Sequence, residues 1–268
     1  MPELPEVETI VQSLQPCLGA TVTQIHIARP DIVRLREYEP EDLLGSTIEK
    51  IWRRGKYLIL VYGPRRNMVL HLGMSGRFFS ASYDYIISEP HVHLVITLGN
   101  EYKLLYQDAR RFGGVWLVQD ISRFFAHLGV EPLSRGFNCG YLKKMIQNRK
   151  IPIKSLLLNQ DQVCGIGNIY ADEALFRAQI RPDRISTTLT HDEVKQLCQA
   201  IKKVLRQGIK YRGTTFRDYR DGQNRSGEFQ KHLQVYGKEG LPCPNCGKML
   251  TRIKIGGRSS HFCGHCQK

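Results

Sequence analysis

Two pairs of cysteines near the end of the chain place the strongest constraint on how it can fold. Cys243 and Cys246 form one CxxC pair, Cys263 and Cys266 form a second, and sixteen residues separate the two pairs. Each pair can present two thiolates to one tetrahedral ion, and the length between the pairs suits a β-hairpin. We therefore predict one structural zinc ion on these four cysteines, with two disulfides or four free thiols as the alternatives. Four protein ligands leave no open position at which the metal could act in catalysis.

The net charge of the chain indicates the class of its partner. Its 268 residues are long enough for two domains, and 39 Lys and Arg residues against 25 Asp and Glu residues give a formal charge of +14. This balance favours a polyanion, either nucleic acid or an anionic membrane surface. No segment is apolar enough to span a bilayer, and the acidic N-terminus lacks a signal-peptide pattern. We therefore expect a cytoplasmic protein with no membrane association.

The first half of the chain has the pattern of an antiparallel β-sandwich. A helix is expected over 6–18, where Val7, Ile10, Val11 and Leu14 have helical spacing. Short β-branched or aromatic runs follow, separated by Gly, Pro or Asn. The predicted strands are 22–28, 48–52, 57–62, 68–72, 91–98, 102–106 and 115–118, and the stretch 80–90 is expected to be a loop.

Beyond about Leu133 the pattern becomes helical. Helices are expected over 141–149, from Pro152 onward, over 169–178, and from a capping box at Thr190 to Gly208. The polar, basic stretch 214–228 is expected to be a mobile loop. We therefore predict an α+β protein with an N-terminal domain over 1–133, a helical domain over 134–239 and a zinc finger over 240–268.

The first residues of the chain can be interpreted in two ways. Removal of Met1 would leave Pro2 with the α-amine, which titrates near ~8 and is partly unprotonated at neutral pH. A secondary amine that attacks a sugar C1′ gives a cationic iminium, and Glu3 would be an adjacent proton carrier. The alternative is ordinary helix-start chemistry, with Pro in the first turn and Glu3, Glu6 and Glu8 near a helix N-terminus.

Two further stretches are candidates for contact with phosphates. A helix that begins at Asn168, after the break at 165–167, offers backbone N–H groups and a positive dipole end, and Lys154 could add a cation. Alternatively, Asn168 is only an N-cap. The four cations between the CxxC pairs, with no acidic residue among them, suit phosphates on a metal-fixed hairpin, although they could also form a solvated basic face. They are Lys248, Arg252, Lys254 and Arg258.

Four motifs occur in this chain in a characteristic order: PELPEVE at the start, HLGMSGR at 71–77, GIGNIYADE at 165–173, and the CxxC pairs. Together they closely resemble bacterial formamidopyrimidine-DNA glycosylase, also called 8-oxoguanine DNA glycosylase, over essentially the whole chain. The resemblance implies an N-terminal β-sandwich domain and a C-terminal helix–two-turn–helix domain with a zinc finger. DNA would bind in the cleft between the domains.

The resemblance also implies a bifunctional glycosylase and β,δ-lyase, which flips an oxidised purine out of the duplex, excises it and cleaves the abasic strand through a Schiff base. Pro2 would attack C1′, Glu3 would serve as acid and base, and Lys56 would be the further catalytic lysine. Lys56 directly precedes the predicted strand 57–62, so it can face a cleft from the strand's edge.

The remaining implied residues contact DNA. Three of them would fill the space left by the flipped base, with Arg110 bonding to the orphaned cytosine; they are Met74, Arg110 and Phe112. Glycines on both sides of Met74 and Phe112 favour exposed turns over core packing, and the adjacent Arg111 competes for the arginine's role. Residues implied near phosphates or DNA are Lys154, Asn168, Tyr236 and Arg258. The stretch 213–228 matches the lesion-recognition loop and carries Arg217, Arg220 and Arg225.

We expect a monomer that acts on damaged double-stranded DNA. Two other functions stay open: an endonuclease VIII-like glycosylase for oxidised pyrimidines, and a zinc-finger DNA-binding protein without catalysis. The presence of Pro2, Glu3 and Lys56 together favours an enzyme, because a pure binding protein has no need of them.

Overall fold

The computed structural model describes residues 1–99, 101–147, 149–216 and 219–268. The chain divides into two compact units, which we describe separately. The first unit comprises 1–127 and 209–230, and the second comprises 128–208 and 231–268. The sequence had placed the boundary at 133 and 134 and had assigned the stretch 209–230 to the helical domain. In the structure this stretch packs with the N-terminal residues instead.

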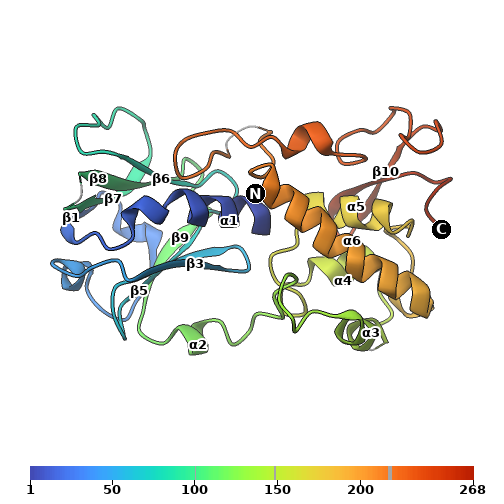
Figure 1. The fold of residues 1–268 in the computed structure, drawn as a ribbon, viewed down its shortest axis with the longest axis horizontal. Coiled ribbons are helices and arrows are strands. Elements are labelled where there is room, and N and C mark those ends of the chain that lie inside the picture. The colour runs from blue at the N-terminus through green and yellow to red at the C-terminus, as the bar shows by residue number, and fades with distance from the viewer. Residues whose placement is uncertain (100, 148, 217–218) are drawn as a thin grey trace. The chain divides into compact units, whose positions relative to one another are not determined.

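The first unit is a sandwich of two sheets with one helix against it (Figure 1). The helix is α1 (Leu4–Ser13), shorter than predicted because a 3₁₀ turn (Gln15–Cys17) replaces its last turn. One sheet has the strand order β1 (Val22–Ile27), β7 (Val92–Leu98), β8 (Tyr102–Gln107) and β6 (Arg77–Ser82). The other has the order β2 (Val33–Arg36), β9 (Gly114–Val118), β5 (Asn67–His71), β4 (Tyr57–Val61) and β3 (Lys50–Arg54).

Two strands of the first unit differ from the sequence prediction. β6 occupies part of the expected 80–90 loop and pairs with β8, and β2 pairs with β9 in parallel rather than antiparallel. The other neighbouring strands of the two sheets are antiparallel. The core lies between the sheets and α1, where Val7, Ile10 and Leu14 are fully buried. A short helix α2 (Ile121–Phe124) follows β9.

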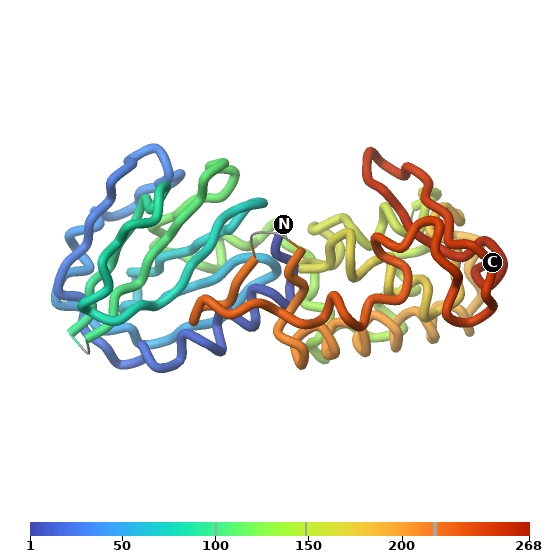
Figure 2. Tube along the Cα trace, turned by 90° about the horizontal axis from the view of Figure 1, so that it is seen from above, coloured from blue at the N-terminus to red at the C-terminus, as the bar shows by residue number. Residues whose placement is uncertain are grey.

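The second unit is mainly helical and ends in a two-stranded hairpin. Its helices are α3 (Cys139–Gln147), α4 (Ile153–Leu158), α5 (Asn168–Arg177) and α6 (His191–Lys210), whose last two residues belong to the first unit. Thr190 and Glu193 form the predicted capping box at the start of α6. The hairpin is β10 (Thr251–Ile255) and β11 (Arg258–Phe262), and it projects from the unit on the side away from α6 (Figure 2). None of the helices in the described ranges is long and apolar enough to cross a membrane.

Candidate functional site

Pro2 and Glu3 lie at the entrance of α1, and both are buried. Glu3 is the N-cap residue, and its backbone N–H donates to Glu6 Oε2 at 2.9 Å in a capping box. The helix-start interactions considered for these residues are therefore present, and the capping box at Glu3 fixes the position of the adjacent Pro2. Met1 precedes Pro2 in the sequence and is 44% exposed, and the Pro2 nitrogen becomes an amine once Met1 is removed.

Lys56 lies in the two-residue turn between β3 and β4, where Arg54 pairs with Tyr57. Gly55 opens the turn with φ +57°, a conformation that glycine adopts without strain. Lys56 is only 7% exposed. Arg53 ties this turn to α1, because its guanidinium pairs with Glu8 at 3.0 Å and donates to the Gly55 carbonyl at 2.9 Å.

His71, the last residue of β5, has a pKa that depends on the charges of Lys56 and the N-terminus. Burial lowers the pKa of His71 to about 4, with help from the positive charges of Lys56 and the N-terminus, while Asp108 opposes the shift. The Gly73 N–H donates to His71 Nδ1 at 3.2 Å, so the ring is neutral with its proton on Nε2. Both charges act on one neutral imidazole, and the N-terminal charge in this structure is that of the Met1 amine.

Met74 and Phe112 lie on two exposed turns that pack backbone to backbone. Met74 is 46% exposed and Phe112 is 59% exposed, as the flanking glycines predicted. A Cβ on Gly73 would lie 2.4 Å from the Gly113 nitrogen, and one on Gly113 would lie 2.2 Å from the His71 carbonyl oxygen. Only glycine allows this close approach, which brings the two exposed side chains onto neighbouring turns.

Arg110, rather than Arg111, faces the same surface as Phe112. The Arg110 guanidinium lies 4.5 Å from the centre of the Phe112 ring, whereas Arg111 pairs with Asp31 at 3.0 Å. The buried Asp108 orders both turns, because its carboxylate accepts from Ser75 Oγ at 2.6 Å and from the Gly113 N–H at 2.9 Å.

The stretch 214–228 was predicted to be a mobile loop, but several of its described residues are hydrogen-bonded to α1. The Thr214 N–H donates to Glu6 Oε1 at 2.7 Å, and the Tyr219 hydroxyl donates to the Glu6 carbonyl at 3.2 Å. Burial, followed by the nearby charge of Glu6, raises the pKa of Tyr219. Arg217 lies outside the described residues.

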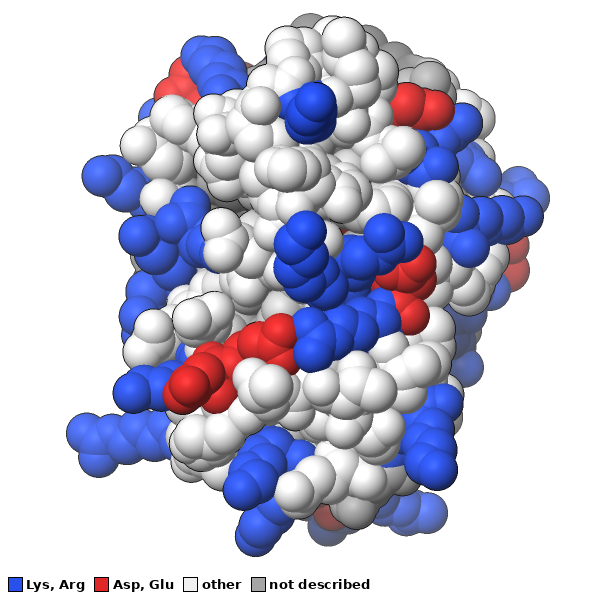
Figure 3. All heavy atoms as spheres, turned by 90° about the vertical axis from the view of Figure 1, so that its right-hand side faces the viewer, with Lys and Arg blue, Asp and Glu red and all other residues white. Residues whose placement is uncertain are grey.

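Three predicted DNA-contact residues of the second unit lie on or beside α5 and β11, which are hydrogen-bonded to each other. Asn168 is the first residue of α5 and Gly167 is the N-cap, so Asn168 does not itself cap the helix. Arg258 is exposed at the start of β11, after a turn in which Gly256 and Gly257 have positive φ. The Tyr236 ring lies 4.9 Å from the His261 ring of β11. Figure 3 shows many Lys and Arg side chains on one face of the molecule, with a smaller number of Asp and Glu side chains among them.

Lys154 does not lie where a phosphate contact requires it, and this prediction is wrong for the present structure. Its side chain is fully buried, and Nζ lies 2.6 Å from Asp172 Oδ1. Nζ also donates to the Ser259 carbonyl at 2.7 Å and to Ser260 Oγ at 2.9 Å. The ammonium therefore joins α4 and α5 to β11, and its donors are directed inward rather than toward solvent.

Two adjacent carboxylates of α5 complete this framework. Asp172 Oδ2 accepts from the His261 N–H at 2.9 Å, and the Glu173 carboxylate accepts from the backbone N–H groups of Gln234, Val235 and Tyr236. Burial raises the pKa of Glu173 although these three hydrogen bonds oppose the shift. The helix that carries Asn168 is thus bonded directly to β11 and to Tyr236.

The four cysteines of the CxxC pairs form one cluster. Their Sγ atoms all lie within 4.8 Å of one another. Cys243 Sγ lies 3.9 Å from Cys266 Sγ, and Cys246 Sγ lies 3.5 Å from Cys263 Sγ. Tetrahedral zinc at about 2.3 Å from each sulfur needs separations of about 3.8 Å, whereas a disulfide needs about 2.05 Å. The cluster therefore fits a structural zinc ion, as predicted, rather than disulfides.

Sequence reasoning missed several residues that order the site. His71 stands in the HLGMSGR motif and Asp108 precedes Arg110, so both were near residues already chosen. Asp172 and Glu173 belong to the GIGNIYADE motif, where only Asn168 had been given a role. The contact of Arg53 with Glu8 crosses 45 residues and has no local signal.

Comparisons with known proteins agree along the whole chain. Residues 1–115 match the formamidopyrimidine-DNA glycosylase N-terminal domain, residues 128–220 match the formamidopyrimidine-DNA glycosylase H2TH domain, and residues 240–268 match a zinc finger found in FPG and IleRS. The formamidopyrimidine-DNA glycosylase of Syntrophomonas wolfei is 56% identical over 268 residues, covering all of both chains. That of Desulforamulus reducens is 46% identical over all of this chain and 99% of its own.

Solved structures give the same result. A Lactococcus lactis FPG mutant in complex with DNA that contains Fapy-dG has a TM-score of 0.92 at 35% identity, covering all of both chains. The MutM (FPG) protein of Thermus thermophilus has a TM-score of 0.89 at 38% identity, covering 99% of this chain and 98% of that one.

Proposed function

The chain belongs to the formamidopyrimidine-DNA glycosylase family, whose members are base-excision repair enzymes, and we propose that Pro2 is the nucleophile of its reaction. The chain is a DNA glycosylase and AP lyase that acts on oxidised purines. After removal of Met1, the Pro2 amine attacks C1′, loses its proton, and the damaged base leaves with the bonding electrons. The C1′–O4′ bond then breaks, O4′ takes up a proton, and the opened sugar is joined to Pro2 as an iminium. The iminium draws electrons from the sugar, so loss of a C2′ proton expels the 3′ phosphate, and δ-elimination of the 5′ phosphate follows.

Glu3 and Lys56 supply the proton transfers and the charge that these steps need. A buried carboxylate beside the nucleophile can take and return protons, and a buried ammonium can stabilise a leaving group that gains negative charge. The observation that carries this proposal is the burial of both groups, because Glu3 is 3% exposed at the N-cap of α1 and Lys56 is 7% exposed in the turn between β3 and β4. The link from Arg53 to Glu8 and to the Gly55 carbonyl supports it, because it holds the Lys56 turn against α1.

We propose that Met74, Arg110 and Phe112 occupy the space that the extruded base leaves. A glycosylase must take its base out of the stack, and the vacated position must then be filled. The exposure of Met74 and Phe112 supports this role, because a core residue could not insert into DNA. The stacking of Arg110 on Phe112 supports the choice of Arg110 over Arg111 for bonding the orphaned base.

Damaged double-stranded DNA is the partner, and we propose that Asn168 and Arg258 contact its phosphates while Tyr236 lies near it. Asn168 stands at the positive end of α5, and Arg258 is exposed on the hairpin. The zinc ion on the four cysteines has no open ligand position, so its role is to hold this hairpin. We further propose that the enzyme works as a monomer in the cytoplasm, at the nucleoid.

The test is a panel of duplexes that each carry one lesion: 8-oxoguanine, a formamidopyrimidine, an oxidised pyrimidine or none. We expect release of the two purine lesions, with strand cleavage by β,δ-elimination. Faster release of the oxidised pyrimidine would favour the endonuclease VIII-like alternative, and binding without product would favour a non-catalytic protein. Glu3→Gln should abolish excision, whereas Glu49→Gln, which alters an exposed carboxylate, should not.

A further inference from the structure

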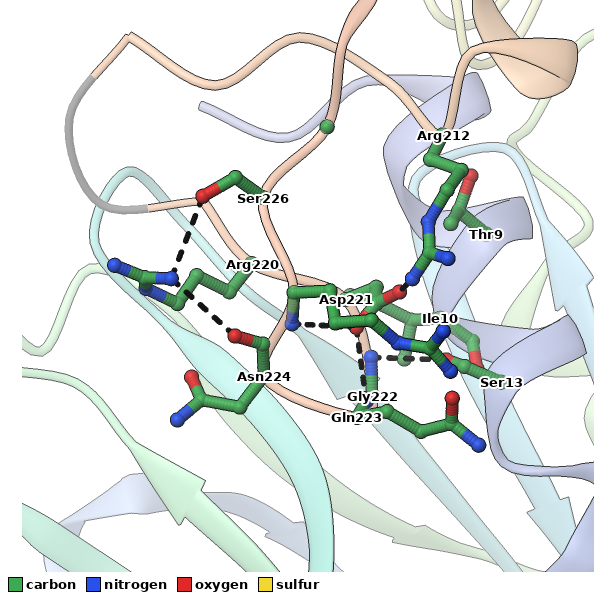
Figure 4. Close-up of polar contacts among 12 residues, drawn as sticks. Thr9, Ile10, Ser13, Arg212, Arg220, Asp221, Gly222, Gln223, Asn224 and Ser226 are labelled. Atoms are coloured by element: carbon green, nitrogen blue, oxygen red, sulfur yellow. Dashed lines mark hydrogen bonds and ion pairs between the residues drawn. The ribbon is translucent and has the colours of Figure 1, made fainter.

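The loop 213–228 is hydrogen-bonded to Ser13, the last residue of α1 (Figure 4). The Gly222 N–H donates to Ser13 Oγ at 2.8 Å, and the Gly222 carbonyl accepts from the Ser80 N–H at 2.7 Å. Ser13 Oγ in turn donates to the Ile10 carbonyl at 2.8 Å, which leaves its lone pairs for Gly222. A Cβ on Gly222 would lie 2.6 Å from Ser13 Oγ, so a larger residue there would displace the hydroxyl that accepts from its backbone N–H.

The neighbouring Asp221 bonds to residues within the loop and to Arg212 at its start. Its carboxylate is 1% exposed, and Oδ1 accepts from the Gln223 N–H at 3.0 Å and from the Arg225 N–H at 2.9 Å. Oδ2 pairs with the guanidinium of Arg212, at the start of the loop. A buried carboxylate is stable only with such partners, so the segment 221–225 and the start of the loop are held in one conformation.

The loop meets α1 at two positions on one face of the helix. Glu6 receives the Thr214 N–H and Ser13 receives the Gly222 N–H, and residues seven apart lie on the same side of a helix two turns from each other. Glu6 Oε2 also holds the backbone N–H of Glu3. The position of the loop is thus tied to the helix whose first turn carries the proposed nucleophile.

We infer that Ser13, Gly222, Asp221 and Arg212 form a latch, defined by these contacts, that positions the loop for removal of the damaged base. Ser13 lies eleven residues after Pro2, about 16 Å along the helix axis, so it is a positioning residue and does not reach the reacting atoms. The inference rests on the proposed function, together with the match of the stretch 213–228 to the lesion-recognition loop of the family. It predicts that releasing the latch slows base excision but not cleavage of an abasic site, which has no base to recognise.

The test uses the full-length enzyme and four proteins: wild type, Ser13→Ala, Ser13→Thr and Gln15→Ala. Gln15 is a matched control, because it lines the same cavity of about 440 Å³ beside the latch, but its side chain bonds to the Val11 carbonyl of its own helix. Single-turnover rates are measured on an 8-oxoguanine duplex and on an abasic duplex. An unsatisfied Gly222 N–H should reduce excision about tenfold in Ser13→Ala, with the abasic rate unchanged. Ser13→Thr keeps the hydroxyl and, like Gln15→Ala, should retain the excision rate.

Amide hydrogen exchange of the free enzyme separates the latch from the proposed function. The Gly222, Gln223 and Arg225 amides should be protected in wild type and should exchange faster in Ser13→Ala. Unchanged protection, or an equal loss of rate on both duplexes, would overturn the latch. If the wild-type enzyme releases no base from any duplex, the proposed function fails, while the exchange experiment still decides whether the latch exists.

Discussion

Replacement of Lys154 tests the reassignment of this residue from the DNA surface to the interior. Lys154→Met keeps most of the side-chain volume but leaves Asp172 buried without its cation. Breaking a buried ion pair on one side costs about 3–5 kcal/mol. With a urea m-value of about 2 kcal/mol per molar, a loss of about 4 kcal/mol lowers the unfolding midpoint of the second unit by about 2 M.

The two units can be followed separately in this experiment. Both tryptophans, Trp52 and Trp116, belong to the first unit, while the helices α3 to α5 and nearly all of α6 belong to the second. Lys154→Met should therefore shift the circular dichroism transition and leave the tryptophan fluorescence transition in place. Adding Asp172→Asn removes the unpaired carboxylate charge and keeps an oxygen that accepts from the His261 N–H. The double variant should therefore recover at least about 1 kcal/mol of the free energy of unfolding lost in Lys154→Met.

Arg258→Ala provides the matched comparison at the surface. It should leave stability unchanged and flatten the log–log salt dependence of DNA binding by about one unit, as expected for one lost phosphate contact. If Lys154→Met behaves in this way, with normal stability and a flatter salt slope, the ammonium meets DNA directly and the assignment of Lys154 to the interior is wrong.

Three further predictions concern the metal, the exposed turns and His71. Chelation of one zinc per chain should abolish DNA binding and leave the tryptophan transition of the first unit unchanged; active protein without zinc would contradict this. Met74→Ala and Phe112→Ala should slow excision from lesion duplexes but spare cleavage of an abasic duplex, whereas equal losses would indicate misfolding or weak binding. His71 is neutral in the fold because its pKa is lowered from 6.5 to about 4, so the unfolded chain binds the extra proton between these values. The contribution of neutral His71 to the free energy of unfolding is fully present above pH 6.5. About 3 kcal/mol of this free energy is lost as the pH falls to 4. Urea unfolding of His71→Gln should lack this part of the pH dependence, and an unchanged pH dependence would refute the assignment.

The strands that the sequence predicted well are those with apolar, β-branched runs. The run from Val22 predicted a strand over 22–28, and β1 spans Val22–Ile27. β6 was missed because serines and an alanine follow its two phenylalanines, and its hydrogen bonds are made to the distant β8. β2 alternates valine and leucine with arginine over only four residues, so its parallel pairing with β9 depends on tertiary packing.

Spacing also predicted the sites that are local in sequence. The four cysteines were identified by their intervals alone, and the exposed turns of Met74 and Phe112 by their glycines. The position of Lys154 could not be predicted in this way, because its partners Asp172 and Ser260 are distant in sequence and leave no local pattern. The docking of the loop was missed for the same reason, since a polar segment without hydrophobic periodicity gives no sign of the helix that it bonds.

The central claim is that the Pro2 amine forms a covalent bond with the lesion-strand sugar, and reductive trapping tests it most directly. Borohydride delivers hydride to C1′ of the iminium and leaves a stable amine that joins protein to damaged DNA. We predict that the cross-link maps to Pro2 in protein whose Met1 is absent by mass spectrometry, and that one added residue ahead of Pro2 abolishes it. Lys56 is the rival nucleophile, because a lysine amine can also form a Schiff base with the sugar. A cross-link that maps to Lys56 and persists in the extended protein would contradict the assignment of Pro2.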